Sequence, residues 1–182
     1  SISDLMSVLM MIFLFISIVY MRSVNLEKNK ITSIAQTYET TQVEITNDLK
    51  KEFTKNLQIW NAVLDSLTLS IRFENPEILF KVGSAELNDH FKSILDSFFP
   101  RFIQILTDPK YKNDIEEIRI EGHTSSEWAG ESSPYQAYFN NMELSQDRTR
   151  KVLEYILSQI KDEQLLHWSK SKLTANGLSS SH

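Results

Sequence analysis

Cysteine is absent from this chain of 182 residues, which excludes disulfide bonds, thiol chemistry and cysteine-ligated metal sites. The four histidines are scattered and do not have the spacing of a zinc site. The sequence also lacks a nucleophile paired with a base and a glycine-rich phosphate loop, so we expect no enzyme active site, metal or cofactor. Lysines are dispersed among glutamates in a chain of net charge −5, which argues against nucleic acid as a partner.

Charge is absent from Leu5–Met21, a run of seventeen residues that contains only two serines. As a helix this run would be about 26 Å long, close to the roughly 30 Å of hydrocarbon in a bilayer. We therefore predict a membrane-spanning helix within residues 1–22. The segment Val19-Tyr20-Met21-Arg22 does not resemble a signal-peptidase site, so we expect the helix to be retained. Taken alone, the basic residues from Arg22 to Lys30 would place that flank in the cytoplasm.

A single acidic residue, Asp4, stands at the head of the apolar run. A carboxylate inside a bilayer costs about 3 kcal/mol on insertion scales, so such a residue usually faces a protein interior or a water-filled path and has a function there. The alternative is that Asp4 lies just outside the membrane. The residue pattern alone leaves both positions open.

Glycine and proline are both missing between Ile31 and Leu67, and apolar residues recur there at steps of three or four. This spacing predicts a long helix, and we assign residues 23–66 to a helical linker. Its narrow apolar stripe favours pairing with a second copy in a homodimer. The alternatives are a helix packed on its own domain and, because Thr41 interrupts the stripe, two shorter helices.

The period changes at Leu67, where apolar and polar residues begin to alternate up to Phe73, as in a half-buried strand. A helix with apolar positions from Phe91 to Phe99, a strand at Ile118 and Ile120, a polar loop over Glu127–Pro134, a helix capped by Ser145 and a last strand at Leu173–Ala175 are expected to follow. This order predicts an α+β fold of the βαβαβ type, a sandwich with helices over a sheet, in residues 67–182.

The motifs of this region occur in an order that resembles the OmpA-like peptidoglycan-binding domain. They are Ile78-Leu79-Phe80, Gly83-Ser84-Ala85-Glu86-Leu87, Ile120-Glu121-Gly122-His123-Thr124, and Asn141 with Leu144-Ser145, Arg148 and Val152. Independently, Asp4-Leu5-Met6-Ser7 followed by Leu9-Met10-Met11 resembles the membrane signature of the flagellar stator B subunits, the MotB family. Within that group, the apolar run from Leu9 and the stretch Gly122–Trp128 look most like the B subunits of Zorya antiphage defence, the ZorB family.

The stator resemblance implies a protein of the bacterial inner membrane with a cytoplasmic N-terminus and a periplasmic C-terminal domain, against the charge count. It also implies a homodimer inside a ring, expected to be a pentamer, of a multi-span A-type subunit. Asp4 would be neutralised and recharged during each ion passage, and Ser7, one turn on, would share its face. Because Asp4 and Ser7 supply few oxygen ligands for sodium, we favour protons.

The OmpA-like resemblance implies that Arg148 holds the carboxylate of the stem-peptide diamino acid, since a guanidinium binds carboxylates through two parallel hydrogen bonds. Asn141 and Thr124 would shape the same pocket, and a helix N-terminus at Ser145 would strengthen anion capture. The chain departs from the family at Ser125, where an aspartate usually binds the amino group; Glu127 or Glu131 could replace it. The alternative for Arg148 is a surface ion pair with Asp147 or Glu154.

Three functions remain open at this point. The first is the wall-anchored B subunit of an ion-driven motor in antiphage defence, and the second is the same subunit in a flagellar stator. The third is a passive peptidoglycan-binding anchor of the cell envelope, which would need Arg148 but neither Asp4 nor an A-type partner.

Overall fold

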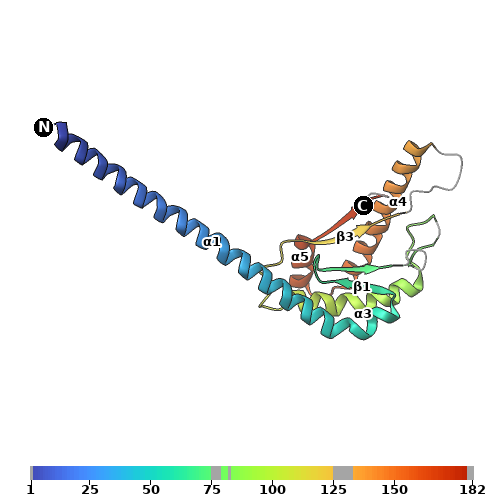
Figure 1. The fold of residues 1–182 in the computed structure, drawn as a ribbon. Coiled ribbons are helices and arrows are strands. Elements are labelled where there is room, and N and C mark those ends of the chain that lie inside the picture. The colour runs from blue at the N-terminus through green and yellow to red at the C-terminus, as the bar shows by residue number, and fades with distance from the viewer. Residues whose placement is uncertain (1, 75–78, 82, 125–132, 180–182) are drawn as a thin grey trace. The chain divides into compact units, whose positions relative to one another are not determined.

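The computed structural model describes residues 2–74, 79–81, 83–124 and 133–179. Two compact units divide the chain, Ser1–Glu44 and Ile45–His182. The mixed helix and strand content confirms the predicted α+β class. In chain order the elements are α1 (Ile2–Ile59), β1 (Ala62–Asp65), β2 (Ser70–Phe73), α3 (Asp89–Leu106), β3 (Ile118–Gly122), α4 (Pro134–Ser158), α5 (Glu163–Lys172) and β4 (Leu173–Gly177), as Figure 1 shows.

The first unit consists of the N-terminal part of α1, whose apolar side chains from Ile2 to Tyr38 are exposed. In the described part of the chain, α1 is the one helix that is long and apolar enough to cross a membrane. The helix continues through Thr41 without a break. Threonines on it remain compatible with the helix because their hydroxyls donate to carbonyls one turn back, as from Thr32 to Lys28 at 2.9 Å and from Thr37 to Ser33 at 3.0 Å.

The end of α1 differs from the prediction, because the helix stops at Ile59 and does not reach Leu67. Asn61 has a φ of 49°, which is in the left-handed region. A right-handed helix needs a negative φ at each residue, so α1 cannot continue through Asn61. The chain then turns back as the antiparallel pair β1–β2, with Ala62 opposite Phe73 and Asp65 opposite Ser70. Residues 66–69 form the turn, so the strand predicted from Leu67 starts only at Ser70.

The core of the second unit includes the last turns of α1. Ile45, Leu49 and Phe53 are buried, and the ring of Phe53 lies 5.2 Å from Phe98 and 5.9 Å from Trp60 between centroids. The compact unit therefore begins at Ile45, whereas we had placed the domain boundary between residues 66 and 67. That boundary stays a prediction, which a truncation experiment described below tests.

The predicted helix around Phe91–Phe99 is α3, and its residues explain where it starts and which face it buries. The side chain of Asn88 accepts a hydrogen bond from the Phe91 amide at 2.7 Å, which satisfies one of the free amides of the first turn. Its apolar residues recur every three or four positions and lie in the core. The buried ones are Phe91, Ile94, Leu95, Phe99, Ile103 and Leu106.

The predicted strands at Ile118 and Leu173 are β3 and β4, which pair in parallel with Ile118 opposite Leu173 and Gly122 opposite Gly177. Helix α4 packs on this pair (Figure 1). Its Gln146 side chain donates to the Ala175 carbonyl at 3.1 Å and accepts from the Gly177 amide at 2.7 Å. The described strands thus form two separate pairs, and α5, which the sequence analysis did not predict, leads directly into β4.

The predicted helix cap at Ser145 is wrong. Helix α4 begins twelve residues earlier, where Ser133 caps it by accepting from the Gln136 amide at 3.2 Å and Pro134 takes the first position. Ser145 lies in the middle of the helix and is fully buried. Its hydroxyl donates to the Met142 carbonyl at 2.9 Å and accepts from the Ser179 amide at 3.1 Å. Arg148 therefore does not lie in the first turn of α4.

Candidate functional site

The guanidinium of Arg148 lies against the segment that precedes α3. Its Nε donates to the Ser84 carbonyl at 2.9 Å, and its Cζ lies 4.8 Å from the centroid of the Phe80 ring. Burial lowers the pKa of this guanidinium from its usual value, because desolvation disfavours the charged form. Among the described residues, the two terminal nitrogens have no hydrogen-bond partner. Arg148 thus offers its two terminal nitrogens as donors to a ligand.

A short turn holds the two groups that contact Arg148. Phe80 pairs with Leu87 in an isolated antiparallel bridge, and the Ser84 amide donates to the Lys81 carbonyl at 3.0 Å. Gly83 has a φ of +65°, which glycine adopts without strain, and an added Cβ there would meet no atom within 4 Å. The turn therefore presents the Ser84 carbonyl toward α4.

The other predicted pocket residues are Thr124, which follows the end of β3, and Asn141, which is on α4. Asn141 is on α4 and almost completely buried, at 2% exposure. The Thr124 amide donates to the Ser179 carbonyl at 2.9 Å, and the Thr124 hydroxyl is buried without a partner among the described residues. The contacts described for Arg148 include neither residue. Ser125, Glu127 and Glu131 lie outside the described residues.

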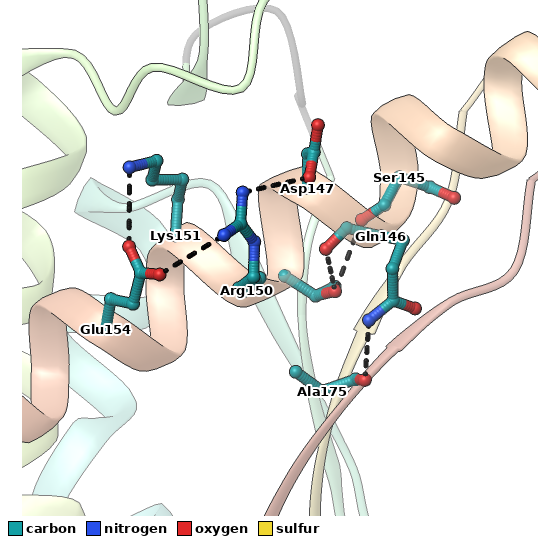
Figure 2. Close-up of polar contacts among 8 residues, drawn as sticks. Ser145, Gln146, Asp147, Arg150, Lys151, Glu154 and Ala175 are labelled. Atoms are coloured by element: carbon teal, nitrogen blue, oxygen red, sulfur yellow. Dashed lines mark hydrogen bonds and ion pairs between the residues drawn. The ribbon is translucent and has the colours of Figure 1, made fainter.

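The surface of α4 around Arg148 shows how its acidic neighbours are used. Figure 2 shows Arg150 between Asp147, at 3.1 Å, and Glu154, at 3.6 Å. Lys151 adds a contact to Glu154 at 3.3 Å. Asp147 and Glu154, the alternative partners of Arg148, are therefore paired with Arg150 and Lys151. Arg148 itself contacts Ser84 and Phe80.

Two contacts of this site were not predicted from the sequence. Phe80 and Ser84 both stand in the motifs that the sequence analysis singled out, but no spacing rule relates them to an arginine more than sixty residues later. Ser179 was also missed, although its amide, carbonyl and hydroxyl bond to Ser145, Thr124 and Tyr138. Only the fold brings these segments together.

The predicted membrane residues lie in the first turns of α1. Asp4 is an exposed residue of the first turn, and the Ser7 hydroxyl donates to the Ser3 carbonyl one turn back at 3.0 Å. Both belong to the first unit, whereas Arg148 belongs to the second. Their part in ion passage stays a prediction.

Comparison with known proteins agrees with this geometry. The family model described as "OmpA family" matches residues 79–181. The Zorya protein ZorB of Escherichia coli (strain ATCC 8739, Crooks) is 52% identical over 184 residues, which span 100% of this chain and 77% of that protein. A crystal structure of a MotB-like protein from Desulfovibrio vulgaris has a TM-score of 0.54 and 23% identity, covering 80% of this chain and 79% of the other, and shows a shared fold. The chain belongs to the OmpA family and to the family of the Zorya protein ZorB.

Proposed function

We propose that this chain is the wall-anchored B subunit of an ion-driven motor in the bacterial inner membrane that serves antiphage defence. The observation that carries the proposal is the combination, in one chain, of an apolar helix headed by Asp4 and an OmpA-family domain that presents the terminal nitrogens of Arg148. The 52% identity to a Zorya protein supports defence rather than motility.

At the membrane end, Asp4 carries the transported charge. One elementary charge that crosses 100 mV releases about 2.3 kcal/mol, enough to change the contacts of a partner subunit with each passage. Ser7 lies one turn from Asp4 on α1 and offers a hydroxyl on the same face of the helix. A proton needs no further ligands, whereas sodium would ordinarily need more oxygen atoms, so the ion is a proton.

At the wall end, Arg148 binds the carboxylate of the peptidoglycan stem-peptide diamino acid. Its Nε is already used by the Ser84 carbonyl, which leaves the terminal nitrogens for a bidentate contact. Asn141 and Thr124 line the same pocket, and Ser125 replaces the aspartate of the family. Because peptidoglycan lies outside the inner membrane, the N-terminus is cytoplasmic and the C-terminal domain periplasmic.

The assembly follows from the same proposal. Two copies of the chain pair as a homodimer within a ring of a multi-span A-type subunit, for which we propose a pentamer. The similarity in fold to a MotB-like protein keeps a flagellar stator as the second candidate function.

The test is phage plating and swimming in a null strain that carries wild type, Asp4→Asn or Arg148→Ala, with membrane insertion of each variant measured. We expect wild type to restore phage resistance and both variants to lose it while they remain inserted. Restored swimming instead would assign the chain to a flagellar stator. Resistance that survives Asp4→Asn would reduce the chain to a passive anchor.

A further inference from the structure

We propose that Phe80 is a positioning residue for Arg148, and that its ring fixes the guanidinium in the orientation that binds a carboxylate. This inference rests on the proposed binding of peptidoglycan and adds a residue to it. It starts from the 4.8 Å separation between the Arg148 Cζ and the centroid of the Phe80 ring. A cation at that distance from an aromatic ring is attracted by the negative potential of the ring face.

The ring itself is held in place from two directions. Phe80 is 8% exposed, and its ring makes an edge-on contact with Phe91 of α3 at 5.5 Å and an interplanar angle of 69°. Its backbone is fixed by the bridge to Leu87. Phe80 is therefore a rigid surface for Arg148, since its backbone cannot move without breaking the bridge to Leu87 and its ring cannot move without disturbing Phe91 of α3.

The ring and the Ser84 carbonyl restrain different parts of the guanidinium. The carbonyl accepts a hydrogen bond from the Nε–H group at 2.9 Å, and the ring lies near Cζ. One hydrogen bond alone leaves the planar group free to rotate about that bond, whereas a ring beside it restricts the rotation. The two terminal nitrogens then keep one direction, which a bidentate contact with a carboxylate requires.

The binding test uses the full chain in detergent micelles and a soluble muropeptide that carries the diamino acid. Phe80→Leu removes the ring but keeps an apolar side chain, and we expect it to weaken muropeptide binding about five- to tenfold. Phe80→Tyr keeps the ring and should stay within about twofold of wild type. Arg148→Lys keeps the charge without the planar group and should bind at least as weakly as Phe80→Leu.

The matched control is Phe99→Leu, which changes a phenylalanine of α3 that is also buried, at 3% exposure, and is not among the described contacts of Arg148. It should lower the thermal unfolding temperature as Phe80→Leu does, yet leave muropeptide binding unchanged. Equal losses of binding in Phe80→Leu and Phe99→Leu, without recovery in Phe80→Tyr, would overturn the inference, because Phe80 would then act only through stability.

A spectroscopic readout separates this inference from the proposed function. In protein labelled with nitrogen-15 arginine, the Arg148 Nε–Hε signal, assigned by its loss in Arg148→Ala, should be shifted by the ring current of Phe80. The shift should disappear in Phe80→Leu and remain in Phe80→Tyr; a signal that is the same in all three proteins would overturn the inference. If wild type binds no muropeptide, the proposed function fails, and this signal still decides whether Phe80 orients Arg148.

Discussion

Two buried serines show at the residue scale why burial alone does not define a role. Ser145 and Ser169 are both completely buried. The Ser145 hydroxyl joins α4 to the segment after β4, because it donates to the Met142 carbonyl and accepts from the Ser179 amide. The Ser169 hydroxyl has no partner among the described residues. A buried polar group without a partner carries a desolvation cost that nothing offsets.

Replacing each serine by alanine should therefore have opposite effects. Ser145→Ala leaves the buried Ser179 amide without an acceptor and should lower the free energy of unfolding by about 1–3 kcal/mol. Ser169→Ala removes an unpartnered hydroxyl and should be neutral or slightly stabilising. Urea denaturation of the two variants beside wild type gives both numbers, and equal losses would contradict the assigned role of Ser145.

The contact of Asp48 with Lys110 and Tyr111 predicts a dependence of stability on pH. The Lys110 ammonium and the Tyr111 hydroxyl donate to the same carboxylate oxygen at 2.6 and 2.8 Å, and these hydrogen bonds lower the pKa of Asp48. The hydrogen bond to Asp48 raises the pKa of Lys110 in turn. The lowered pKa of Asp48 means that this contact stabilises the fold when the pH is above the pKa of the unfolded carboxyl, and that the stabilisation is lost in acid. The raised pKa of Lys110 means that its contribution to stability is kept until the pH becomes alkaline.

We therefore expect Asp48→Asn to lower the unfolding temperature at pH 7. The loss should be only a few degrees, because the ion pair with Lys110 is exposed and contributes little, and what is lost besides it is the hydrogen bond from the buried Tyr111. The difference from wild type should start to shrink as the pH falls below about 4, where the unfolded carboxyl becomes protonated, and should vanish below the lowered pKa of Asp48 in the folded protein. Tryptophan fluorescence during heating at several pH values measures it. A difference that stays the same from pH 7 down to the most acidic pH at which the protein still folds would show that the ion pair is not its cause.

At the element scale, glycines set how closely α4 approaches the β3–β4 pair. A Cβ at Gly177 would lie 2.2 Å from the backbone nitrogen of Gln146 and 2.7 Å from the Ser145 hydroxyl. A Cβ at Gly122 would lie 2.7 Å from a methyl of Thr149 and 2.9 Å from the Ser145 carbonyl. Since the atoms opposite Gly177 are mostly backbone, the helix itself would have to move.

Alanine at these positions should consequently be costly in a definite order. We expect Gly177→Ala to lower the free energy of unfolding by about 3 kcal/mol and Gly122→Ala by about 2 kcal/mol, because both overpack a rigid contact. Gly83→Ala is the control: its Cβ would meet open space, so only the positive φ costs energy, about 1 kcal/mol. Chemical denaturation of the three variants checks the order, and a larger loss for Gly83→Ala than for Gly177→Ala would refute it.

At the scale of the whole molecule, the division into compact units at Ile45 and the boundary predicted between residues 66 and 67 lead to different expectations for truncated proteins. Removal of residues 1–44 should leave a cooperatively folded protein, because Ile45, Leu49 and Phe53 stay in the core. Removal of residues 1–66 deletes all three, at about 2–5 kcal/mol each, which exceeds the usual margin of domain stability. Circular dichroism and urea denaturation of the two fragments test this. A stably folded fragment 67–182 would instead support the predicted domain boundary between residues 66 and 67.

The sequence predicted the elements whose period was clear, and it missed those where a local conformation interrupts the period. The alternation at Ile118 and Ile120 and the apolar face of α3 were read correctly. The apolar stripe continues through Trp60 and Leu64, so nothing in its spacing reveals that Asn61 takes a positive φ and ends α1. Ser145 precedes an apolar run, which is an N-cap signal, but α4 also includes the polar residues before it.

The candidate site was predicted through its motifs more than through its physics. Arg148, Asn141 and Thr124 were singled out because they stand in recognisable positions, and the structure gives each a described environment. The supports of Arg148 come from a turn more than sixty residues earlier, a distance over which no periodicity operates. Family resemblance therefore suggested these residues, whose role in binding stays a prediction, while the contacts of Arg148 could be found only from the fold.

The Gln146 amide has a further consequence for how copies of this domain can associate. A strand with unpaired backbone groups along one side is a template for another chain. The carboxamide of Gln146 occupies the Ala175 carbonyl and the Gly177 amide of β4 as a peptide of a neighbouring strand would. One glutamine thus occupies two backbone groups of β4 that a foreign strand would otherwise bind, and it disfavours growth of the β3–β4 pair into a continuous sheet between copies.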